Sequence, residues 1–235
     1  MHIRMRIVPI HKNWNYFSAN VDKQRRKIDN NLDKILGNRV RFSSIESGTG
    51  VVRMRVITGF AKGRKLRTLS GEDVRPTTDR VKEALFSIIQ FEIEGRRVLD
   101  LFAGSGQLGI EALSRGAASA VFVDSSRDSI EVVRENLNTT QLAQSAQVMQ
   151  MDSLAFLAGQ CGPFDIALLD PPYGAGLVQR ALPMAARRMA PGGVMICEAP
   201  AKEDLPEQAE DFCLLRRYSY GRISLALYRR EGEGA

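Results

Sequence analysis

The sequence predicts an α/β fold in which helices alternate with the strands of a mostly parallel sheet. From residue 97 onward, short apolar runs of strand length alternate with segments whose apolar residues recur every three to four positions. A glycine-rich turn joins one such run to a helical segment, and an aspartate stands at the end of four of the runs. At 235 residues, with 44% hydrophobic residues, the chain is long enough for one domain with a complete core.

The predicted elements follow one another from residue 54. A strand pair over about 54–69 comes first, and the cap signal 75–79 then starts a helix. This helix carries apolar residues on one face, namely Val81, Ala84, Leu85, Ile88 and Ile89. Strands near 97, 119, 146 and 164 alternate with helices near 106, 126 and 175. A strand at 194–198 precedes two β-rich runs, about 211–218 and 222–229, which the turn Tyr220-Gly221 joins into a hairpin.

The first 53 residues differ from the rest of the chain. We divide the sequence into an extension, 1–53, and one folded unit, 54–235, which consists of a hairpin with linker, 54–75, and a core, 76–235. Residues 23–36 can form an amphipathic helix, but no clear core element follows it before Met54. We expect the extension to be poorly ordered. Translation starting at Met54 and a basic arm that binds RNA are the two alternatives for it.

Composition excludes several classes of protein. No apolar run reaches the length of a membrane span, and Arg4 and Arg6 interrupt the start, so no secretory signal forms. The three cysteines have neither metal nor disulfide spacing, which predicts a reducing cytoplasm. Residues 54–235 contain no histidine, and this excludes Ser-His-Asp and zinc mechanisms for the main unit. We expect a monomer without a metal ion.

The glycine-rich turn spans residues 100–109 and has the order strand, turn, helix. Such a turn binds the adenosine end of NAD or of S-adenosylmethionine, and Asp124, twenty residues after Gly104, suits the ribose hydroxyls. Asp100 favours S-adenosylmethionine because a carboxylate suits its ammonium group and opposes a pyrophosphate. Asp152 can bind the adenine amine, cap a helix, or do both. The predicted cofactor-binding residues are Asp100, Phe102, Ala103, Gly104, Ser105, Gly106, Asp124, Asp152 and Ser153.

The motif Asp170-Pro171-Pro172-Tyr173 follows the apolar run 166–169 and predicts a site for an amine on a nucleobase. A residue before proline is held extended, and proline has no N–H, so the Asp170 carboxylate and the Pro171 carbonyl can both accept from one amine. Asp170 would also stabilise the charge that develops on the nitrogen. Tyr173 would stack on a base that has left its helix. The alternative is a Pro-Pro turn with Tyr173 as part of the core.

Charge is distributed unevenly along the chain. Residues 1–53 carry eleven Lys and Arg against four Asp and Glu, residues 54–82 eight against three, and residues 83–235 fourteen against twenty. A basic front of this kind suits contacts with phosphate groups, which position RNA without reading its sequence. A solvated hairpin edge is the alternative. The predicted RNA-binding residues are Arg55, Lys62, Arg64, Lys65, Arg67, Arg75 and Arg80, and Lys82 belongs to the same basic run.

Several motifs in a fixed order resemble the RsmD family of 16S ribosomal RNA guanine-N2 methyltransferases. They are 54–59 with 62–66, the RPTTDRV segment 75–81 with 83–86, 98–106, 109–117, Asn136-Leu137, 169–173 and Tyr220-Gly221. The chain departs from the common family pattern at Gln107, where alanine is usual, and at Asp124, where glutamate is usual.

The resemblance implies a Rossmann-like class I methyltransferase domain over 54–235, with a seven-stranded, mostly parallel sheet whose last strand is antiparallel, and an N-terminal β-hairpin. It also implies that Asp170, Pro171, Pro172 and Tyr173 hold the target guanine, in RNA of the small ribosomal subunit or of an assembly intermediate. The sequence does not say which guanine is chosen.

Methyl transfer would then be direct, without a covalent enzyme intermediate. Three alternatives are an adenine-N6 DNA methyltransferase, a nicotinamide oxidoreductase, and a ribosome-assembly factor that binds RNA without catalysis. The oxidoreductase is disfavoured by the lack of histidine after residue 53 and by Asp100, and the assembly factor has no need of the motif at 170–173.

Overall fold

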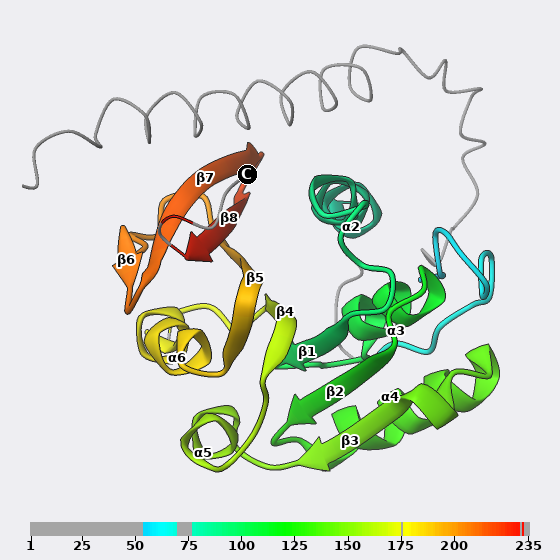
Figure 1. Cartoon of the computed structure of the whole chain (residues 1–235). Coiled ribbons are helices and arrows are strands. Elements are labelled where there is room, and N and C mark those ends of the chain that lie inside the picture. Colours follow the sequence, from blue (N-terminus) through cyan, green and yellow to red (C-terminus); the bar gives the residue numbers. More distant parts are fainter. Residues whose placement is uncertain (1–53, 70–76, 175, 231, 233–235) are drawn as a thin grey trace, which may run out of the picture.

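A computed structural model describes residues 54–69, 77–174, 176–230 and 232. Its centre is a mixed sheet in the order β3-β2-β1-β4-β5-β8-β7-β6 (Figure 1). The first five strands are parallel to one another, and β8 is antiparallel to both β5 and β7. The strands are β1 Arg97–Leu101, β2 Ser119–Asp124, β3 Ala146–Gln150, β4 Phe164–Leu169, β5 Met189–Pro200, β6 Gln208–Ala209, β7 Phe212–Tyr220 and β8 Ile223–Arg230.

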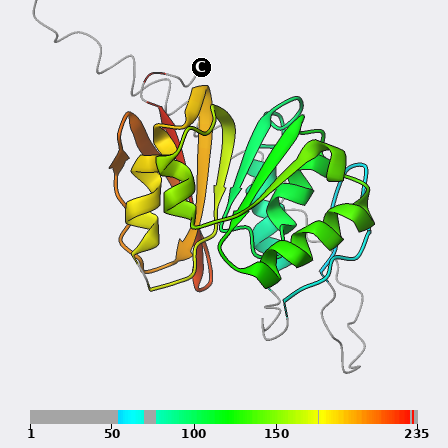
Figure 2. The same cartoon turned by 90° about the horizontal axis from the view of Figure 1, so that it is seen from below.

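Helices cover both faces of the sheet. They are α2 Thr77–Ile88, α3 Gln107–Ser114, α4 Arg127–Thr140, α5 Ser153–Ala158 and α6 Leu177–Ala186, with a 3₁₀ turn at Ala143–Ser145. The apolar residues of α2, α3 and α4 share one buried cluster with one face of the sheet, and those of α5 and α6 share a second cluster with the other face. Figure 2 shows α5 and α6 side by side.

The central strands are buried because helices lie above and below them. In β4, the last four residues are buried without alternation, which explains why the sequence there is one continuous apolar run. Successive residues still point to opposite faces: Leu168 belongs to the cluster with α2 and α3, and Leu169 to the cluster with α5 and α6. Within the part of the chain that the structure describes, no helix is long and apolar enough to cross a bilayer.

The structure confirms the Rossmann-like α/β class and the antiparallel last strand, and it corrects two details. The sheet has eight strands among the described residues, not seven, because the two residues of β6 pair with the start of β7. Of the predicted strand pair at 54–69, the structure has one isolated bridge, between Arg55 and Lys65, and backbone hydrogen bonds on either side of it, from the Val56 N–H to the Arg64 carbonyl oxygen at 3.0 Å and from the Leu66 N–H to the Met54 carbonyl oxygen at 2.8 Å. The remainder packs on α3: a Cβ on Gly59 would lie 1.7 Å from the Ser114 carbonyl oxygen, so only glycine permits this approach.

The extension 1–53 and the linker that contains Arg75 lie outside the described residues. The cap signal at 75–79 correctly placed the start of α2, which begins at Thr77.

Candidate active site

The turn between β1 and α3 contains three residues with a left-handed backbone, namely Phe102, Gly104 and Gly106. Phe102 has a φ of 65° although it carries a side chain, and Gly104 has a φ of 53°. A Cβ added to Gly104 would meet no atom within 4 Å, so the space beside it is open. A Cβ on Gly109 would lie 2.3 Å from Cε1 of Phe122, so this glycine lets α3 pack closely on β2. The turn therefore has a tightly packed base and an open side at Gly104.

Asp100 lies within β1 and is almost completely buried, with 1% of its surface exposed. Its Oδ2 accepts a hydrogen bond from the Gly109 N–H at 2.8 Å, so it joins β1 to the first turn of α3. Burial raises the pKa of Asp100 to about 7, although the Gly109 hydrogen bond acts in the opposite direction, and the charge of Asp124 raises it further. In this structure the Asp100 carboxylate is closed off from solvent.

Three other residues of the turn that were predicted to bind the cofactor are also directed into the protein. Ala103 and Ser105 are buried, and the Ser105 hydroxyl donates to Sδ of Met54 at 3.5 Å. A Cβ on Gly106 would lie 3.1 Å from Cγ2 of Val133, so Gly106 serves the packing of α4 on the turn. The space beside Gly104, in contrast, is open.

Two further aspartates stand where neighbouring strands end. Asp124 is the last residue of β2, and its carboxylate accepts from the Gly104 N–H at 2.9 Å and the Ser126 N–H at 2.8 Å. Asp152 follows β3, is exposed, and accepts from the Ala155 N–H at 2.8 Å. Its role as the N-cap of α5 is thereby confirmed, while a contact with an adenine amine stays a prediction. Ser153, the next residue, is buried.

The motif 170–173 leaves the carboxyl end of β4. Pro171 is buried and Pro172 is exposed. The Tyr173 ring is 41% exposed, so Tyr173 is not part of the core, and its hydroxyl donates to Oε1 of Glu198 at 3.2 Å. The alternative that made this tyrosine a core residue is wrong. Because the side chain is exposed, stacking of Tyr173 on a base stays a prediction.

Asp170 borders a small cavity of about 30 Å³ between α2, α3 and the ends of β4 and β5. This volume holds water but not a purine ring, so a base has to displace surrounding groups to enter. Within the described part of the chain, Oε1 of Gln107 is buried without a hydrogen-bond partner. The cavity is lined by Val81, Lys82, Leu85, Gln107, Leu108, Asp170 and Glu198.

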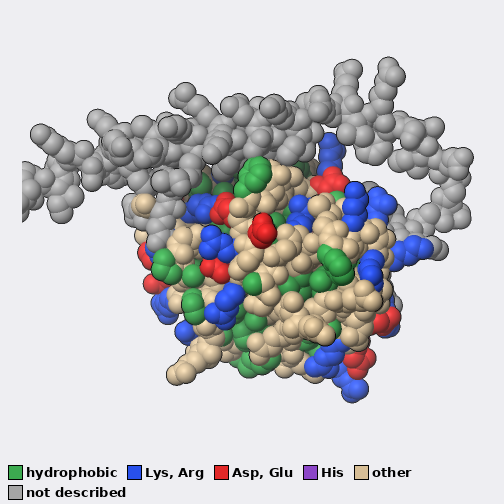
Figure 3. All heavy atoms as spheres, turned by 45° about the vertical axis from the view of Figure 1, so that its right-hand side comes forward, with side chains coloured by type: hydrophobic (Ala, Val, Ile, Leu, Met, Phe, Trp, Pro, Cys, Tyr) green, Lys and Arg blue, Asp and Glu red, His purple; other side chains and the backbone are tan. Residues whose placement is uncertain are grey.

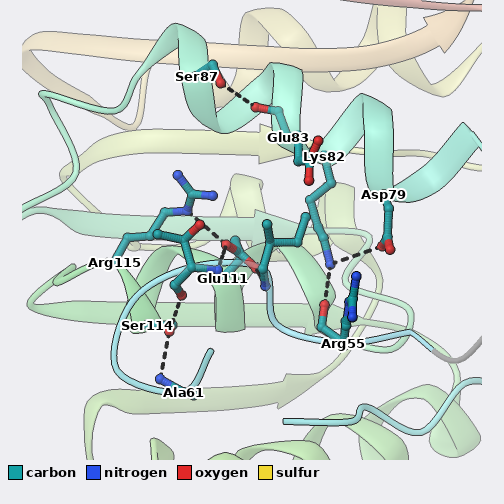
Figure 4. Close-up of polar contacts among 11 residues, drawn as sticks. Arg55, Ala61, Asp79, Lys82, Glu83, Ser87, Glu111, Ser114 and Arg115 are labelled. Carbon is teal, nitrogen blue, oxygen red and sulfur yellow. Dashed lines mark hydrogen bonds and ion pairs between the residues drawn. The ribbon is translucent and has the colours of Figure 1, made fainter. Parts of the chain in front are cut away.

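Lys82 is buried, contrary to its place in the basic run of the sequence (Figure 4). Its Nζ donates to the Arg55 carbonyl oxygen at 2.8 Å and lies 3.9 Å from Oδ1 of Asp79. Burial lowers the pKa of Lys82, and the nearby Glu111 and Asp79 carboxylates partly offset this effect. Lys82 therefore connects α2 to the segment 54–69 and does not contribute to an RNA-binding surface.

Glu111 is also a buried charged residue, with 1% of its side chain exposed (Figure 4). Its carboxylate accepts from the N–H groups of Ile57 and Thr58, at 2.8 and 3.0 Å, and from Nε of Arg115 at 2.9 Å. Asn136 of α4 is buried as well: its side-chain amide forms hydrogen bonds with both backbone groups of Arg67 and with the carbonyl oxygen of Ser105. These contacts connect the segment 54–69 to α3, α4 and the glycine turn.

The structure separates the predicted RNA-binding residues into two groups. Arg64 donates to the Thr139 carbonyl oxygen and to Oε1 of Gln141, and Arg67 pairs with Glu135, so both have partners on or next to α4. Arg67 is exposed all the same, as are the others that the structure describes, namely Arg55, Lys62, Lys65 and Arg80. Figure 3 shows several Lys and Arg side chains on the side of the molecule where the segment 54–69 lies.

The strand order brings the predicted site residues to one edge of the sheet. The ends of β3, β2, β1, β4 and β5 lie there in sequence, so Asp152, Asp124, the glycine turn, Asp170 and Glu198 follow one another along this edge. Sequence reasoning assigned no site role to Glu198 and Glu111, named Asn136 only as part of a motif, and placed Lys82 in the basic run. For Glu111 a signal was present, since it is a charge inside the apolar helix sequence QLGIEALS.

Comparison with known proteins gives a family. The protein-family model described as "Conserved hypothetical protein 95" matches residues 54–229 of this chain. The chain is 40% identical over 184 residues to the Bacillus subtilis (strain 168) protein named "Putative rRNA methyltransferase YlbH", a match that covers 76% of this chain and all of the relative. It is 35% identical over 190 residues to "Ribosomal RNA small subunit methyltransferase D" of Escherichia coli (strain K12), covering 80% of this chain and 94% of that protein.

A solved structure agrees with these relatives. "Putative methyltransferase yhhF from Escherichia coli" superimposes with a TM-score of 0.69 at 35% identity, over 76% of this chain and 98% of that chain. The shared segment includes the glycine turn, the motif at 170–173 and the antiparallel end of the sheet, since the family model spans all three. The resemblance found in the sequence motifs is confirmed: the chain belongs to the RsmD/YlbH family, described as Conserved hypothetical protein 95.

Proposed function

We propose that this protein transfers a methyl group from S-adenosylmethionine to the exocyclic N2 amine of a guanine in 16S ribosomal RNA of the small subunit. One observation carries the proposal. The pair Leu101 and Leu169 stands in register at the ends of β1 and β4. The glycine turn and Asp170 therefore begin side by side, and a donor on the turn would lie next to an amine held by Asp170.

The residues at the strand ends fit the cofactor. The open space beside Gly104 admits a ligand close to the backbone, and Asp124 and Asp152 present carboxylates along the same edge for ribose hydroxyls and an adenine amine. A carboxylate oxygen has more than one acceptor site, so the hydrogen bonds to Gly104 and Ser126 leave capacity on Asp124. S-adenosylmethionine would supply an electrophilic methyl group on a sulfonium. Asp100 would not contact the cofactor: it accepts a hydrogen bond from the Gly109 N–H and so holds α3 in place beneath the turn.

Asp170 and the Pro171 carbonyl oxygen would hold the two hydrogens of the amine. The nitrogen lone pair would then point toward the methyl group, and the carboxylate would stabilise the positive charge that develops on the nitrogen as the carbon–nitrogen bond forms, the carbon–sulfur bond breaks and the neutral thioether leaves. The proton leaves afterwards to water. Positioning of this kind supplies on the order of 7 to 11 kcal/mol in well-oriented reactions, so the enzyme needs neither a metal ion nor a covalent intermediate. Tyr173, exposed beside Asp170, would stack on the base.

Two observations support ribosomal RNA as the substrate. Relatives that share most of their length with this chain carry ribosomal RNA small subunit methyltransferase in their names. The exposed cations Arg55, Lys62 and Lys65 lie on the segment next to the glycine turn, where they can contact phosphate groups around an inserted base.

Asp170→Asn tests the proposal, because it keeps the size of the side chain and removes its charge. We expect methyl transfer from labelled cofactor to undermethylated small subunits to slow by about 100-fold or more, while the Kd for the cofactor changes less than about threefold. Asp204→Asn, on the exposed loop after β5, is the matched control and should keep full activity.

Mass spectrometry of 16S RNA from cells with and without the gene identifies the target base. RNA from the cells without the gene should lack one N2-methylguanine. Nearly normal methylation by Asp170→Asn would contradict the assigned role of this residue. Methylation of DNA adenine in place of the subunit, or subunit binding without transfer, would replace the proposed activity by one of its alternatives.

A further inference from the structure

A second carboxylate borders the cavity beside Asp170. Cys197 of β5 stands in register with Leu169 of β4, so the residues that follow them, Glu198 and Asp170, are neighbours on adjacent strands. Residues two apart on a strand share a face: Ile196 and Leu168 pack in the cluster with α2 and α3, and the two carboxylates continue on that face. Both line the same cavity.

The polar groups around this cavity are mainly acceptors. Asp170 and Glu198 contribute carboxylates, and Gln107 contributes a buried Oε1 that has no partner in the described part of the chain. The cation that lines the cavity, Lys82, already donates to the Arg55 carbonyl oxygen. A buried acceptor without a donor costs on the order of 1 to 3 kcal/mol, so the cavity suits a ligand that brings N–H groups.

Bases differ in the donors that they carry beside the amine. In guanine the ring nitrogen N1, next to the N2 amine, has a hydrogen, so N1–H and N2–H form a row of donors. In adenine and cytosine the ring nitrogen beside the amine has a lone pair and no hydrogen. Two neighbouring carboxylates accept from the first arrangement and repel the second. On the basis of the proposed function, we infer that Glu198 selects guanine by accepting the N1–H while Asp170 accepts from the N2 amine.

Tyr173 links the selecting residue to the stacking residue. Its hydroxyl donates to Oε1 of Glu198 at 3.2 Å, although the two residues are 25 positions apart in sequence. A carboxylate that accepts this hydrogen bond can still accept from N1–H, because its two oxygens offer about four acceptor sites. The contact keeps the carboxylate in place beside the position where the ring of Tyr173 would meet the base.

Glu198→Gln combined with an altered base tests this inference. Small subunits are reconstituted with 16S RNA that carries guanine or 2-aminopurine at the target position. 2-Aminopurine keeps the N2 amine but has a lone pair at N1. We expect the wild-type protein to prefer guanine by about 100-fold or more, because the carboxylate rejects a base without the N1–H. In Glu198→Gln, whose amide can donate to N1, this preference should fall at least about tenfold.

The comparison of rates separates the possible roles of Glu198. If Glu198 only stabilises the fold, both substrates slow by the same factor and the preference is unchanged, which would overturn the inference. Equal methylation of the two bases by the wild-type protein would overturn it as well, while leaving the proposed function intact. Failure of the wild-type protein to methylate the guanine subunits would instead refute the proposed function. Glu207→Gln, an exposed glutamate near β6, is the control and should keep the wild-type preference.

Discussion

The carboxyl group of Asp100 is buried between β1 and α3, and burial raises its pKa to about 7. In the unfolded chain the same group ionises near its ordinary value of 3.8. Well below pH 3.8 the Asp100 carboxyl group is protonated in both the folded and the unfolded chain, so its ionisation does not oppose folding. As the pH rises toward 7 the unfolded state loses its proton first, so folding becomes less favourable, by on the order of 4 kcal/mol once the folded state has also ionised.

Asp100→Asn removes this dependence, because an amide oxygen can still accept from the Gly109 N–H and no charge is buried. We expect the free energy of unfolding of the variant, relative to wild type, to increase between about pH 4 and pH 7 and to stay constant above pH 7. Urea unfolding at several pH values measures this difference. A difference that is the same at pH 4.5 and pH 8 would show that Asp100 ionises equally in both states.

At the scale of elements, buried polar contacts join the segment 54–69 to the helices of the domain. Its own two arms are paired by one bridge and by backbone hydrogen bonds beside it, and Glu111 of α3 accepts from two of its backbone N–H groups. Figure 4 shows the contacts that Glu111 and Lys82 make with the backbone of this segment. Removal of a partner from such a buried cluster is costly because the remaining groups lose both water and protein contacts.

Glu111→Ala should therefore lower the free energy of unfolding by about 3 kcal/mol or more, since Arg115 and two N–H groups lose their acceptor. Amide hydrogen exchange should accelerate most at Ile57 and Thr58. The control is Glu131→Ala, which removes an exposed ion pair with Arg127 of the same i, i+4 spacing and should cost less than about 0.5 kcal/mol. Equal losses in the two variants would mean that Glu111 does not anchor the segment.

At the scale of the whole molecule, the basic front predicts that RNA and cofactor binding respond differently to salt. Lys62→Ala with Lys65→Ala removes two exposed cations and should weaken RNA binding and reduce the slope of log K against log salt by about 2, while the Kd for S-adenosylmethionine stays the same. Arg187→Ala with Lys202→Ala removes two exposed cations outside the segment 54–69, at the end of α6 and in the turn after β5; this control should leave the slope unchanged. If neither double variant changes the slope, Lys62 and Lys65 are solvated and do not contact RNA.

Much of the fold could be predicted because its signals are local. The apolar runs marked the buried strands, the cap at 75–79 marked the start of α2, and Tyr220-Gly221 marked the final hairpin. The glycine turn was recognisable for the same reason: Gly104 and Gly109 are required by the backbone conformation and by close packing within ten residues of chain. For the site, the backbone conformation of the motif at 170–173 could be predicted, since its two prolines restrict the chain around Asp170.

The sequence by itself thus determined the class of fold, the glycine turn and the place of Asp170 at the end of a buried strand, because each depends on neighbours along the chain. Only the tertiary structure decided that Lys82 is buried, that Glu111 holds residues 57 and 58, and that Glu198 stands beside Asp170. The physical reason is that these positions depend on strand order and helix packing, which join segments 25 to 54 residues apart. A charged residue has the same local pattern whether solvent or another element covers it.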